Sequence, residues 1–333
     1  MSLDVALSPE WLTEALNVPV HGVTIADTIG GVATKIRFTI DTEAGTHRHY
    51  CLKGLFTNEP AAAHARITRT ETSFYRDLAE KVGVAVPTCR YAAVDEEQGN
   101  GVIIMEDIVE KGGRFLTALE PYTPEEARSS LRELATLHAA NWGRPDGPSW
   151  LRNRLDDLAA APLRTEAEHQ DLMDDPRGDS LPGELRDAKR ITACLRALAD
   201  RTADQDATLV HGDAHAGNIY LLADSVALID WQMLQRSHWS IDVAYHVGAA
   251  LSVEQRRTTE RDLLDHYLDH LTELGAAGVP DREQAWTDYR AAVAYGFYLW
   301  SVTRQVAPAV TREFCLRLGT AVDDLESYAL LDV

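Results

Sequence analysis

A short polar segment, HGDAHAGN at residues 211–218, carries the side chains best suited to chemistry. Asp213 is a carboxylate that can accept the proton of a hydroxyl group and orient that group for attack. Asn218, five residues later, and Asp230, in the segment VALIDWQ, are oxygen donors of the kind that hold Mg²⁺. Transfer of a phosphoryl group needs such a base together with hard oxygen ligands, because its catalysis consists mainly of positioning and charge neutralisation.

Two short predicted strands, TLVH and SVALIDW, flank this polar loop. Most of the chain after residue 107 has helical spacing instead, as in PEEARSSLRELATLHAANW, and residues 165–190 predict a polar surface excursion. The first hundred residues are different. A short helix is expected over residues 8–17, followed by strands between residues 23 and 56, a helix over 59–82, and a strand pair at RYAAVD and GVIIMEDI.

At HGDAHAGN and LIDW the sequence resembles the aminoglycoside phosphotransferase and choline kinase-like superfamily, whose members carry an HGDxHxxN loop and an IDW or IDF metal aspartate. The segments IDWQ, ETSFYRDLA and LATLHAANW are most similar to the ecdysteroid kinase-like (CHK kinase-like) branch. The resemblance implies an α+β, protein-kinase-like fold of two lobes. A β-rich nucleotide-binding lobe is expected over residues 1–106, and a mostly helical lobe with the catalytic loop and acceptor site over residues 107–333.

The same resemblance implies an ATP-binding apparatus in the first lobe. Lys53, in the apolar strand HYCLKGLF, is expected to be the one lysine that reaches the α- and β-phosphates, with Glu71 as its ion-pair partner. Gly30 and Gly31, at the first hairpin bend, are expected to let the backbone approach the phosphates closely. The backbone from Glu106 to Ile108 is expected to contact the adenine edge.

The resemblance also makes Asp213 the catalytic base and Asn218 and Asp230 the ligands of Mg²⁺. Each assignment has a structural alternative. An aspartate in a turn commonly bonds its own backbone, an asparagine tolerates left-handed backbone, and Asp230 could cap a strand end. Lys53 could extend to solvent along its apolar stem, and Glu71 could be a solvated helix residue.

Other residues around the loop are expected to support it. His211 is expected to be structural, whereas a contact of His215 with phosphate or metal-bound water stays open. Asp242, in SIDVAYHVG, matches an aspartate that braces the catalytic loop by accepting backbone N–H bonds. Six aromatic residues are expected mainly to pack helices, although a lining role in an acceptor pocket stays open: Trp231, Trp239, Tyr245, Tyr295, Tyr298 and Trp300.

Composition limits the remaining classes of protein. A chain of 333 residues with 45% apolar residues can form two cored units. The formal charge of −20 argues against a nucleic-acid partner, and no signal peptide or membrane span is evident, so a cytoplasmic protein is expected. The four scattered cysteines are expected to be reduced core residues. Motifs of P-loop enzymes, serine hydrolases and zinc proteases are absent from the sequence.

The sequence therefore predicts a phosphotransferase that uses ATP and Mg²⁺ to phosphorylate a hydroxyl of a small molecule. The alternative is a catalytically silent nucleotide-binding pseudokinase that acts through protein interactions. Only eleven residues separate Asp230 from Asp242, too few for the activation segment of a protein kinase, which disfavours a protein substrate. Aminoglycosides, sugars, amino alcohols and sterols all stay open as acceptors, as do ATP versus GTP preference and oligomeric state.

Overall fold

The computed structural model describes residues 1–43, 47–56, 62–97, 99–144, 147–223 and 225–333. It divides into two compact units. The first unit comprises Met1–Arg114, Leu221–Asp224 and Ile229–Met233, and the second comprises Phe115–Tyr220, Ser225–Leu228 and Leu234–Val333. Asp230 therefore belongs to the first unit although it lies late in the sequence. The expected boundary after residue 106, and the task given to each lobe, stay predictions.

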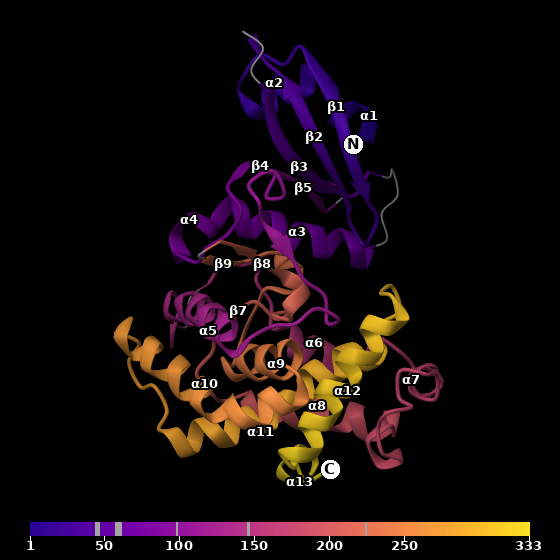
Figure 1. Cartoon of the computed structure of the whole chain (residues 1–333), viewed down its shortest axis with the longest axis vertical. Coiled ribbons are helices and arrows are strands. Elements are labelled where there is room, and N and C mark those ends of the chain that lie inside the picture. Colours follow the sequence, from indigo (N-terminus) through magenta and orange to yellow (C-terminus); the bar gives the residue numbers. More distant parts are fainter. Residues whose placement is uncertain (44–46, 57–61, 98, 145–146, 224) are drawn as a thin grey trace. The chain divides into compact units, whose positions relative to one another are not determined.

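A five-stranded antiparallel sheet in the order β1-β2-β3-β5-β4 forms the centre of the first unit (Figure 1). Its strands are β1 (Gly22–Ile29), β2 (Thr34–Asp41), β3 (His47–Gly54), β4 (Cys89–Asp95) and β5 (Asn100–Glu106). Alternation in TKIRFTID places Ile36, Phe38 and Ile40 in the core, while the residues between them are only half-buried. The predicted strands of this region are confirmed.

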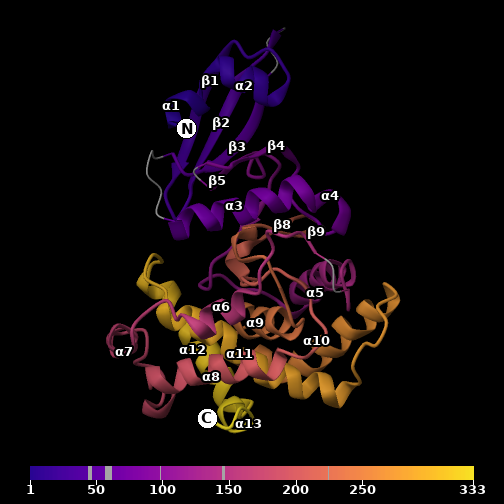
Figure 2. The ribbon, with the colours of Figure 1, turned by 180° about the vertical axis from the view of Figure 1, so that it is seen from behind.

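Helices cover both faces of this sheet (Figures 1 and 2). The helices α1 (Leu3–Ala6) and α2 (Pro9–Leu16) supply Ala6 and Leu12, respectively, to a core that includes Phe38 and Leu52. Ser8 starts α2 because its side chain accepts a hydrogen bond from the backbone N–H of Trp11. On the opposite face lie α3 (Ala62–Asp77) and α4 (Ala79–Val82), which replace the single predicted helix over 59–82. Residues 59–61 of that prediction lie outside the described residues.

Close packing of α3 on the sheet requires a glycine in β5. An added Cβ at Gly101 would lie 2.1 Å from the Thr72 Oγ1 atom and 2.9 Å from the carbonyl oxygen of Thr68. Contacts this short are not tolerated between packed atoms, so a larger residue would push α3 away from the sheet. The absence of a side chain at Gly101 therefore allows α3 to pack closely on the sheet.

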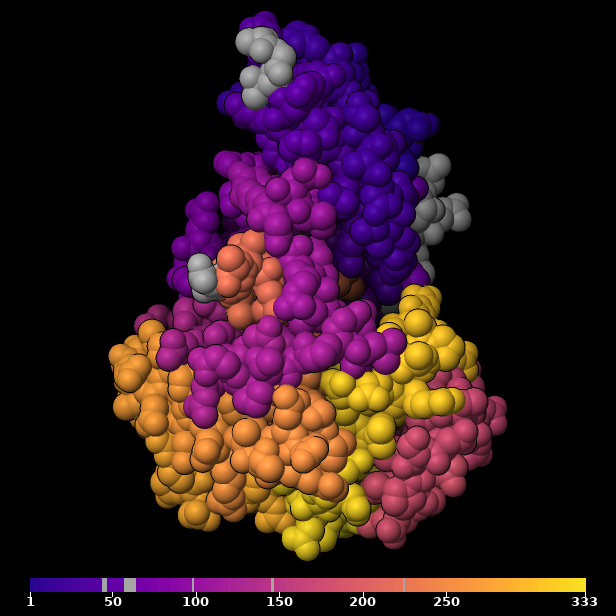
Figure 3. Space-filling model, in the orientation of Figure 1, coloured from indigo at the N-terminus to yellow at the C-terminus, as the bar shows by residue number. Residues whose placement is uncertain are grey.

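The second unit is mostly helical, and its C-terminal helices form much of the surface visible in Figure 3. Its helices are α5 (Pro124–Ala139), α6 (Arg154–Ala160), α7 (Glu166–Met173), α8 (Ala188–Thr202), α9 (Ser240–Ala250), α10 (Val253–Glu273), α11 (Arg282–Val302), α12 (Pro308–Asp324) and α13 (Ser327–Leu330). Every residue of α9 is buried, and α9 packs along α11. Among the described residues, no helix has the length and apolar character needed to cross a membrane.

Most residues of the segment 165–190 are exposed or half-buried, as expected for a surface excursion, but the segment also has helical structure that was not predicted. It contains α7, a 3₁₀ turn (Gly183–Leu185) and the start of α8. Thr165 and Glu168 form a reciprocal capping box that starts α7, and His169 and Met173 are buried one turn apart. Two buried side chains, one turn apart, are enough to anchor this helix although most residues of the segment are polar.

Short strands frame the polar loop of residues 211–218. The strand β7 (Thr208–Val210) pairs antiparallel with β10 (Gln235–Ser237), while β6 (Arg114–Phe115), β8 (Ile219–Leu222) and β9 (Ser225–Leu228) form a three-stranded sheet in the order β6-β8-β9. Single 3₁₀ turns, Ala216–Asn218 and Trp231–Met233, follow β7 and β9. The predicted strands at TLVH and SVALIDW are confirmed, whereas β8 had not been predicted.

Candidate active site

Lys53 lies at the centre of a buried ion cluster in the first unit. Its Nζ atom is 2.6 Å from Oε2 of Glu71 and 3.0 Å from Oδ1 of Asp230. The side chains of Lys53 and Glu71 are 4% and 3% exposed, so the alternatives of a solvent-facing lysine and a solvated glutamate are wrong. Burial lowers the pKa of Lys53, but the two carboxylates outweigh this effect and raise the pKa to about 12. Lys53 is therefore a cation throughout the physiological range.

Glu71 and Asp230 reach this lysine from α3 and from the turn after β9. Burial raises the pKa of Glu71, and the Lys53 ammonium acts in the opposite direction. Trp231, the residue after Asp230, stacks on Phe74 of α3 with ring centroids 3.8 Å apart. Asp230 itself has a φ of 65°, in the left-handed region that most side chains avoid. Packing of the tryptophan on α3 thus holds Asp230 beside Lys53, 177 residues away in sequence.

A second lysine, which the sequence analysis missed, also reaches Asp230. The Nζ atom of Lys35 on β2 lies 3.6 Å from Oδ2 of Asp230. Lys35 and Lys53 are directly opposite each other in the β2–β3 register, so both side chains project from the same face of the sheet. The sequence predicts both strands, but it does not predict their register. Only the register shows that Lys35 lies opposite Lys53.

The residues expected to approach the phosphates and the adenine also lie in the first unit. Gly30 and Gly31 lie in the bend between β1 and β2, and neither has the left-handed backbone that favours glycine. Glu106 ends β5, and its N–H donates to the carbonyl of Thr88. The carbonyl of Ile108 accepts the N–H groups of residues 111 and 113. The roles assigned to these four site residues stay predictions.

Asp213 and Asn218 are neighbours within the second unit. The Nδ2 atom of Asn218 donates to Oδ2 of Asp213 and to its main-chain carbonyl, each at 2.9 Å. Oδ1 of Asp213 accepts a hydrogen bond of 3.0 Å from the hydroxyl of Tyr245. Both oxygens of this carboxylate are thus held by side chains, while the Asp213 side chain remains 28% exposed. The loop presents an oriented carboxylate to solvent.

Asp242 of α9 braces the loop of residues 211–218, as the sequence predicted. Its Oδ2 accepts the N–H of His211 at 2.6 Å, and its Oδ1 accepts the N–H of Gly212 at 2.7 Å. The carboxylate is fully buried and also contacts Nε2 of His138 at 3.1 Å. Gly212 has a φ of 76°, a conformation that strongly favours glycine. This prediction is confirmed.

Further groups from α9 and α11 support the same loop. The hydroxyl of Tyr295 donates to the carbonyl of Gly212 at 2.8 Å, and Nδ1 of His246 lies 2.8 Å from the carbonyl of Ala214. An added Cβ at Gly296 of α11 would lie 2.4 Å from the ring of Tyr245. Gly296 therefore leaves the space in which Tyr245 reaches Asp213. From the sequence the two tyrosines could be recognised only as aromatic residues, because helix packing decides where their hydroxyls point.

The two histidines of the motif are held inside the loop. Nδ1 of His211 accepts the N–H of Asp213 at 3.2 Å, and His211 is fully buried, which supports its expected structural role. Nδ1 of His215 accepts the N–H of Gly217, and its ring lies 5.2 Å from the ring of Trp300. A contact of His215 with phosphate stays a prediction. The six aromatic residues considered above are all buried, as expected for packing.

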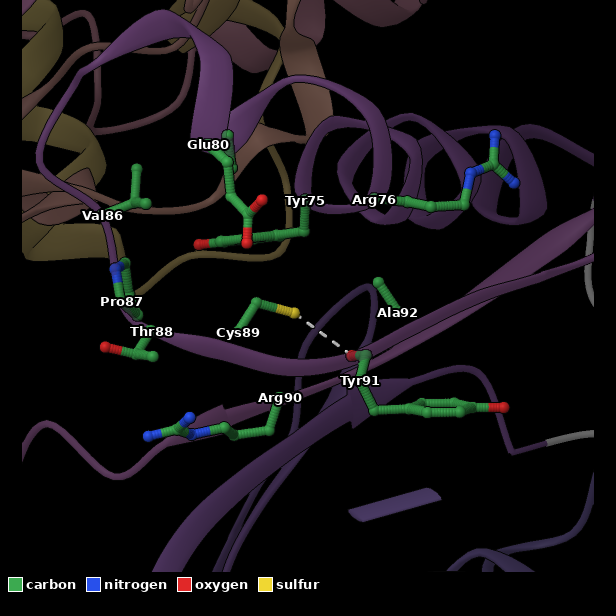
Figure 4. Close-up of a pocket in the computed structure, with 11 residues that line it drawn as sticks. Tyr75, Arg76, Glu80, Val86, Pro87, Thr88, Cys89, Arg90, Tyr91 and Ala92 are labelled. Atoms are coloured by element: carbon green, nitrogen blue, oxygen red, sulfur yellow. Dashed lines mark hydrogen bonds between the residues drawn. The ribbon is translucent and has the colours of Figure 1, made fainter. Parts of the chain in front are cut away.

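The first unit also has a separate pocket of about 410 Å³ (Figure 4). Tyr75 and Glu80 line it from α3 and α4, and residues 86–88 and Cys89 line it from the connection into β4. The thiol of Cys89 donates to the carbonyl of Tyr91, and burial raises the pKa of Cys89 to about 11. Because none of the lining residues belongs to the ion cluster of Lys53, this pocket is distinct from the candidate active site.

The protein has a kinase-like fold. One unit contains an antiparallel sheet with a buried lysine–glutamate pair, and the other is helical and contains the loop with Asp213 and Asn218. The chain belongs to the phosphotransferase enzyme family, whose sequence profile matches residues 38–285.

Solved structures of similar fold include three kinases. Choline kinase from Cryptosporidium parvum is 12% identical with a TM-score of 0.56, over 98% of this chain and 93% of that one. Choline kinase LicA from Streptococcus pneumoniae is 14% identical with a TM-score of 0.52, over 96% and 97%. The amicoumacin kinase hAmiN, solved in complex with AMP-PNP, Ca²⁺ and Ami, is 13% identical with a TM-score of 0.53, over 94% of this chain and 92% of that one. No curated protein matches the sequence.

Proposed function

We propose that this protein is a small-molecule kinase that moves the γ-phosphate of ATP to a hydroxyl group. The observation that carries the proposal is the burial of Lys53 between Glu71 and Asp230. Burying charged side chains costs free energy, and an apolar cluster would stabilise the fold at least as well. A permanent cation held in place by two carboxylates is instead what binding of a triphosphate requires.

The remaining contacts with the nucleotide are proposed for backbone groups of Gly30, Gly31, Glu106 and Ile108. An added Cβ at Gly30 would meet no atom within 4 Å, and its backbone is not left-handed, so the fold itself does not require glycine there. A phosphate close to the backbone supplies a reason for Gly30 and Gly31. Because the N–H of Glu106 and the carbonyl of Ile108 are already bonded, the Glu106 carbonyl and the Ile108 N–H are the groups proposed for adenine.

Asn218 and Asp230 are proposed as the protein ligands of Mg²⁺, and their chemistry fits this ion. The amide nitrogen of Asn218 donates a hydrogen bond to Asp213, so the Oδ1 atom of Asn218 can act as a ligand of a cation. Asp230 has a carboxylate that is 20% exposed. Amide and carboxylate oxygens are hard ligands, and Mg²⁺ takes few protein ligands because it also binds substrate phosphates. When bound, it would neutralise the charge of the phosphates.

Asp213 is proposed as the base that orients the acceptor hydroxyl and takes its proton. Hydrogen bonds from Asn218 and Tyr245 fix its two oxygens, and each oxygen retains a lone pair for the incoming hydroxyl. The partly exposed side chain is accessible to a small molecule. Orientation by fixed neighbours removes much of the entropic cost of attack.

The ecdysteroid kinase-like branch is proposed on the segments IDWQ, ETSFYRDLA and LATLHAANW. A cytoplasmic location stays an expectation from the sequence. The acceptor is proposed only as a small hydroxylated molecule. The alternative, a silent pseudokinase, predicts that at least one of the five key residues is lost or displaced. Lys53, Glu71 and Asp230 are joined in one cluster, and Asp213 and Asn218 in another, which favours the enzyme.

An ADP-release screen across hydroxylated metabolites and aminoglycosides tests this proposal, with the Asp213→Ala variant as blank. We expect acceptor-dependent ADP release from the wild type and a loss of about 10²–10⁴-fold in the variant. Nucleotide binding, measured by isothermal titration calorimetry, should be nearly unchanged in the variant. Turnover within tenfold of the wild type would refute the role of Asp213, and nucleotide binding without turnover on any acceptor would support the pseudokinase.

A further inference from the structure

Two lysines, and not one, face the carboxylate of Asp230. Lys53 lies 3.0 Å from one carboxylate oxygen, and Lys35 lies 3.6 Å from the other. With Glu71 beside Lys53, the four side chains contain two positive and two negative charges. All four belong to the first unit, and the two lysines come from opposite positions of adjacent strands.

The two lysines differ sharply in how firmly they are held. The Lys53 side chain is 4% exposed and contacts two carboxylates, whereas the Lys35 side chain is 36% exposed and contacts Asp230 at the longer distance. An exposed ion pair of this kind contributes little free energy, because water screens it and the side chain loses entropy. Lys35 can therefore exchange Asp230 for another anion at little cost.

Like charges directly opposite each other on a sheet repel, so the pair of Lys35 and Lys53 needs an anion nearby. Asp230 supplies this charge within the protein. We infer that Lys35 is a second phosphate-binding residue, which contacts the triphosphate of the bound nucleotide alongside Lys53. The inference rests on the proposed function, since it assumes that a nucleotide binds at this cluster.

The competing explanation is that Lys35 only neutralises Asp230. The two explanations differ in what a Lys35→Met variant loses. If Lys35 contacts phosphate, the variant binds ATP more weakly even when EDTA removes divalent cations. If Lys35 acts only on Asp230, its removal changes nucleotide affinity only when Mg²⁺ is present, through the carboxylate proposed to bind that ion.

Isothermal titration calorimetry of the full chain with ATP and with adenosine, each with Mg²⁺ and with EDTA, tests the inference. We expect Lys35→Met to weaken ATP binding about tenfold in both conditions, to leave adenosine binding unchanged, and Lys35→Arg to retain most of the affinity. Lys81→Met removes an exposed lysine of α4 and serves as the matched control. Because Lys35 is partly exposed, thermal unfolding of the variant should stay near that of the wild type.

Two results would overturn the inference alone. Either Lys35→Met binds ATP as tightly as the wild type while Lys53→Met binds it weakly, or the loss in Lys35→Met disappears in EDTA. In both cases the proposed function stands. A wild-type chain that binds no nucleotide in any condition overturns the proposed function and this inference with it.

Discussion

Tyr245 donates a hydrogen bond of 3.0 Å to Oδ1 of Asp213, the carboxylate proposed as catalytic base. The tyrosine is fully buried in α9, and its oxygen accepts a hydrogen bond of 2.7 Å from Nε1 of Trp300 in α11. Burial and the nearby Asp213 charge raise the pKa of Tyr245 well above its ordinary value. The hydroxyl therefore keeps its proton and remains a donor at every physiological pH.

Removing this hydroxyl should impair catalysis more than nucleotide binding. We expect Tyr245→Phe to lower kcat about tenfold with the acceptor that the ADP-release screen identifies, because Asp213 loses one of its two fixing contacts. The KM for ATP should be unchanged. Stability should fall by about 1–3 kcal/mol, since the indole N–H of Trp300 loses its acceptor.

A matched control for this variant is Tyr289→Phe. Tyr289 is also fully buried, and its hydroxyl donates to Glu260 at 3.2 Å. That variant should lose stability without the drop in kcat. Equal kcat values for the wild type and Tyr245→Phe would show that Tyr245 does not position the base.

The buried pair of Lys53 and Glu71 should show strong coupling in stability. Lys53→Met leaves the buried Glu71 carboxylate without its cation, while Asp230 keeps its contact with Lys35, and we expect a loss of about 3–5 kcal/mol in the free energy of unfolding. The double variant Lys53→Met/Glu71→Leu should recover part of that loss, because it removes a buried charge. Urea unfolding of the wild type, both single variants and the double variant measures the coupling. Additive losses would contradict the ion pair.

Asp242 should be needed for the shape of the loop of residues 211–218. Asp242→Asn replaces one of two accepting oxygens by an NH₂ group that faces a backbone N–H, so we expect a loss of about 3 kcal/mol. Asp262→Asn, at an exposed position of α10, is the control and should be nearly neutral. Urea unfolding at neutral pH provides the comparison, and an Asp242→Asn chain as stable as this control would rule out the bracing role.

His246 should make the protein sensitive to acid. Burial lowers its pKa to about 4 and outweighs the hydrogen bond from Nδ1 to the carbonyl of Ala214, which acts in the opposite direction. Nε2 lies 2.6 Å from the hydroxyl of Ser130. In the unfolded chain an ordinary histidine titrates near 6.5. The unfolded state thus binds the proton first, so stability is complete above pH 6.5 and falls as the pH drops from 6.5 towards 4.

The size of this effect should be about 2–3 kcal/mol for His246 between pH 6.5 and 4. Urea unfolding at several pH values checks it, with His246→Gln as the variant that does not titrate. The variant should be less stable at pH 7.5 but should lose less stability on acidification. An identical pH slope in both proteins would contradict the role of His246.

Features that depend on residues within one short segment could be predicted from the sequence. The spacing of Asp213 and Asn218 in HGDAHAGN is enough to bring them together, because five residues of loop and 3₁₀ turn leave little freedom. Alternation in TKIRFTID and the cap at Ser8 likewise predicted β2 and α2. The helix α7 was missed because its few apolar residues are recognisable only by what they bury against.

The types of the site residues, their order and the strands and helices that carry them were thus determined by the sequence itself, since local backbone preferences and apolar spacing act over a few residues. Only the tertiary structure decided that Lys35 lies opposite Lys53, that Asp230 reaches both lysines, and that Tyr245 points at Asp213. These contacts depend on strand register and helix packing, which are set by burial summed over many distant residues.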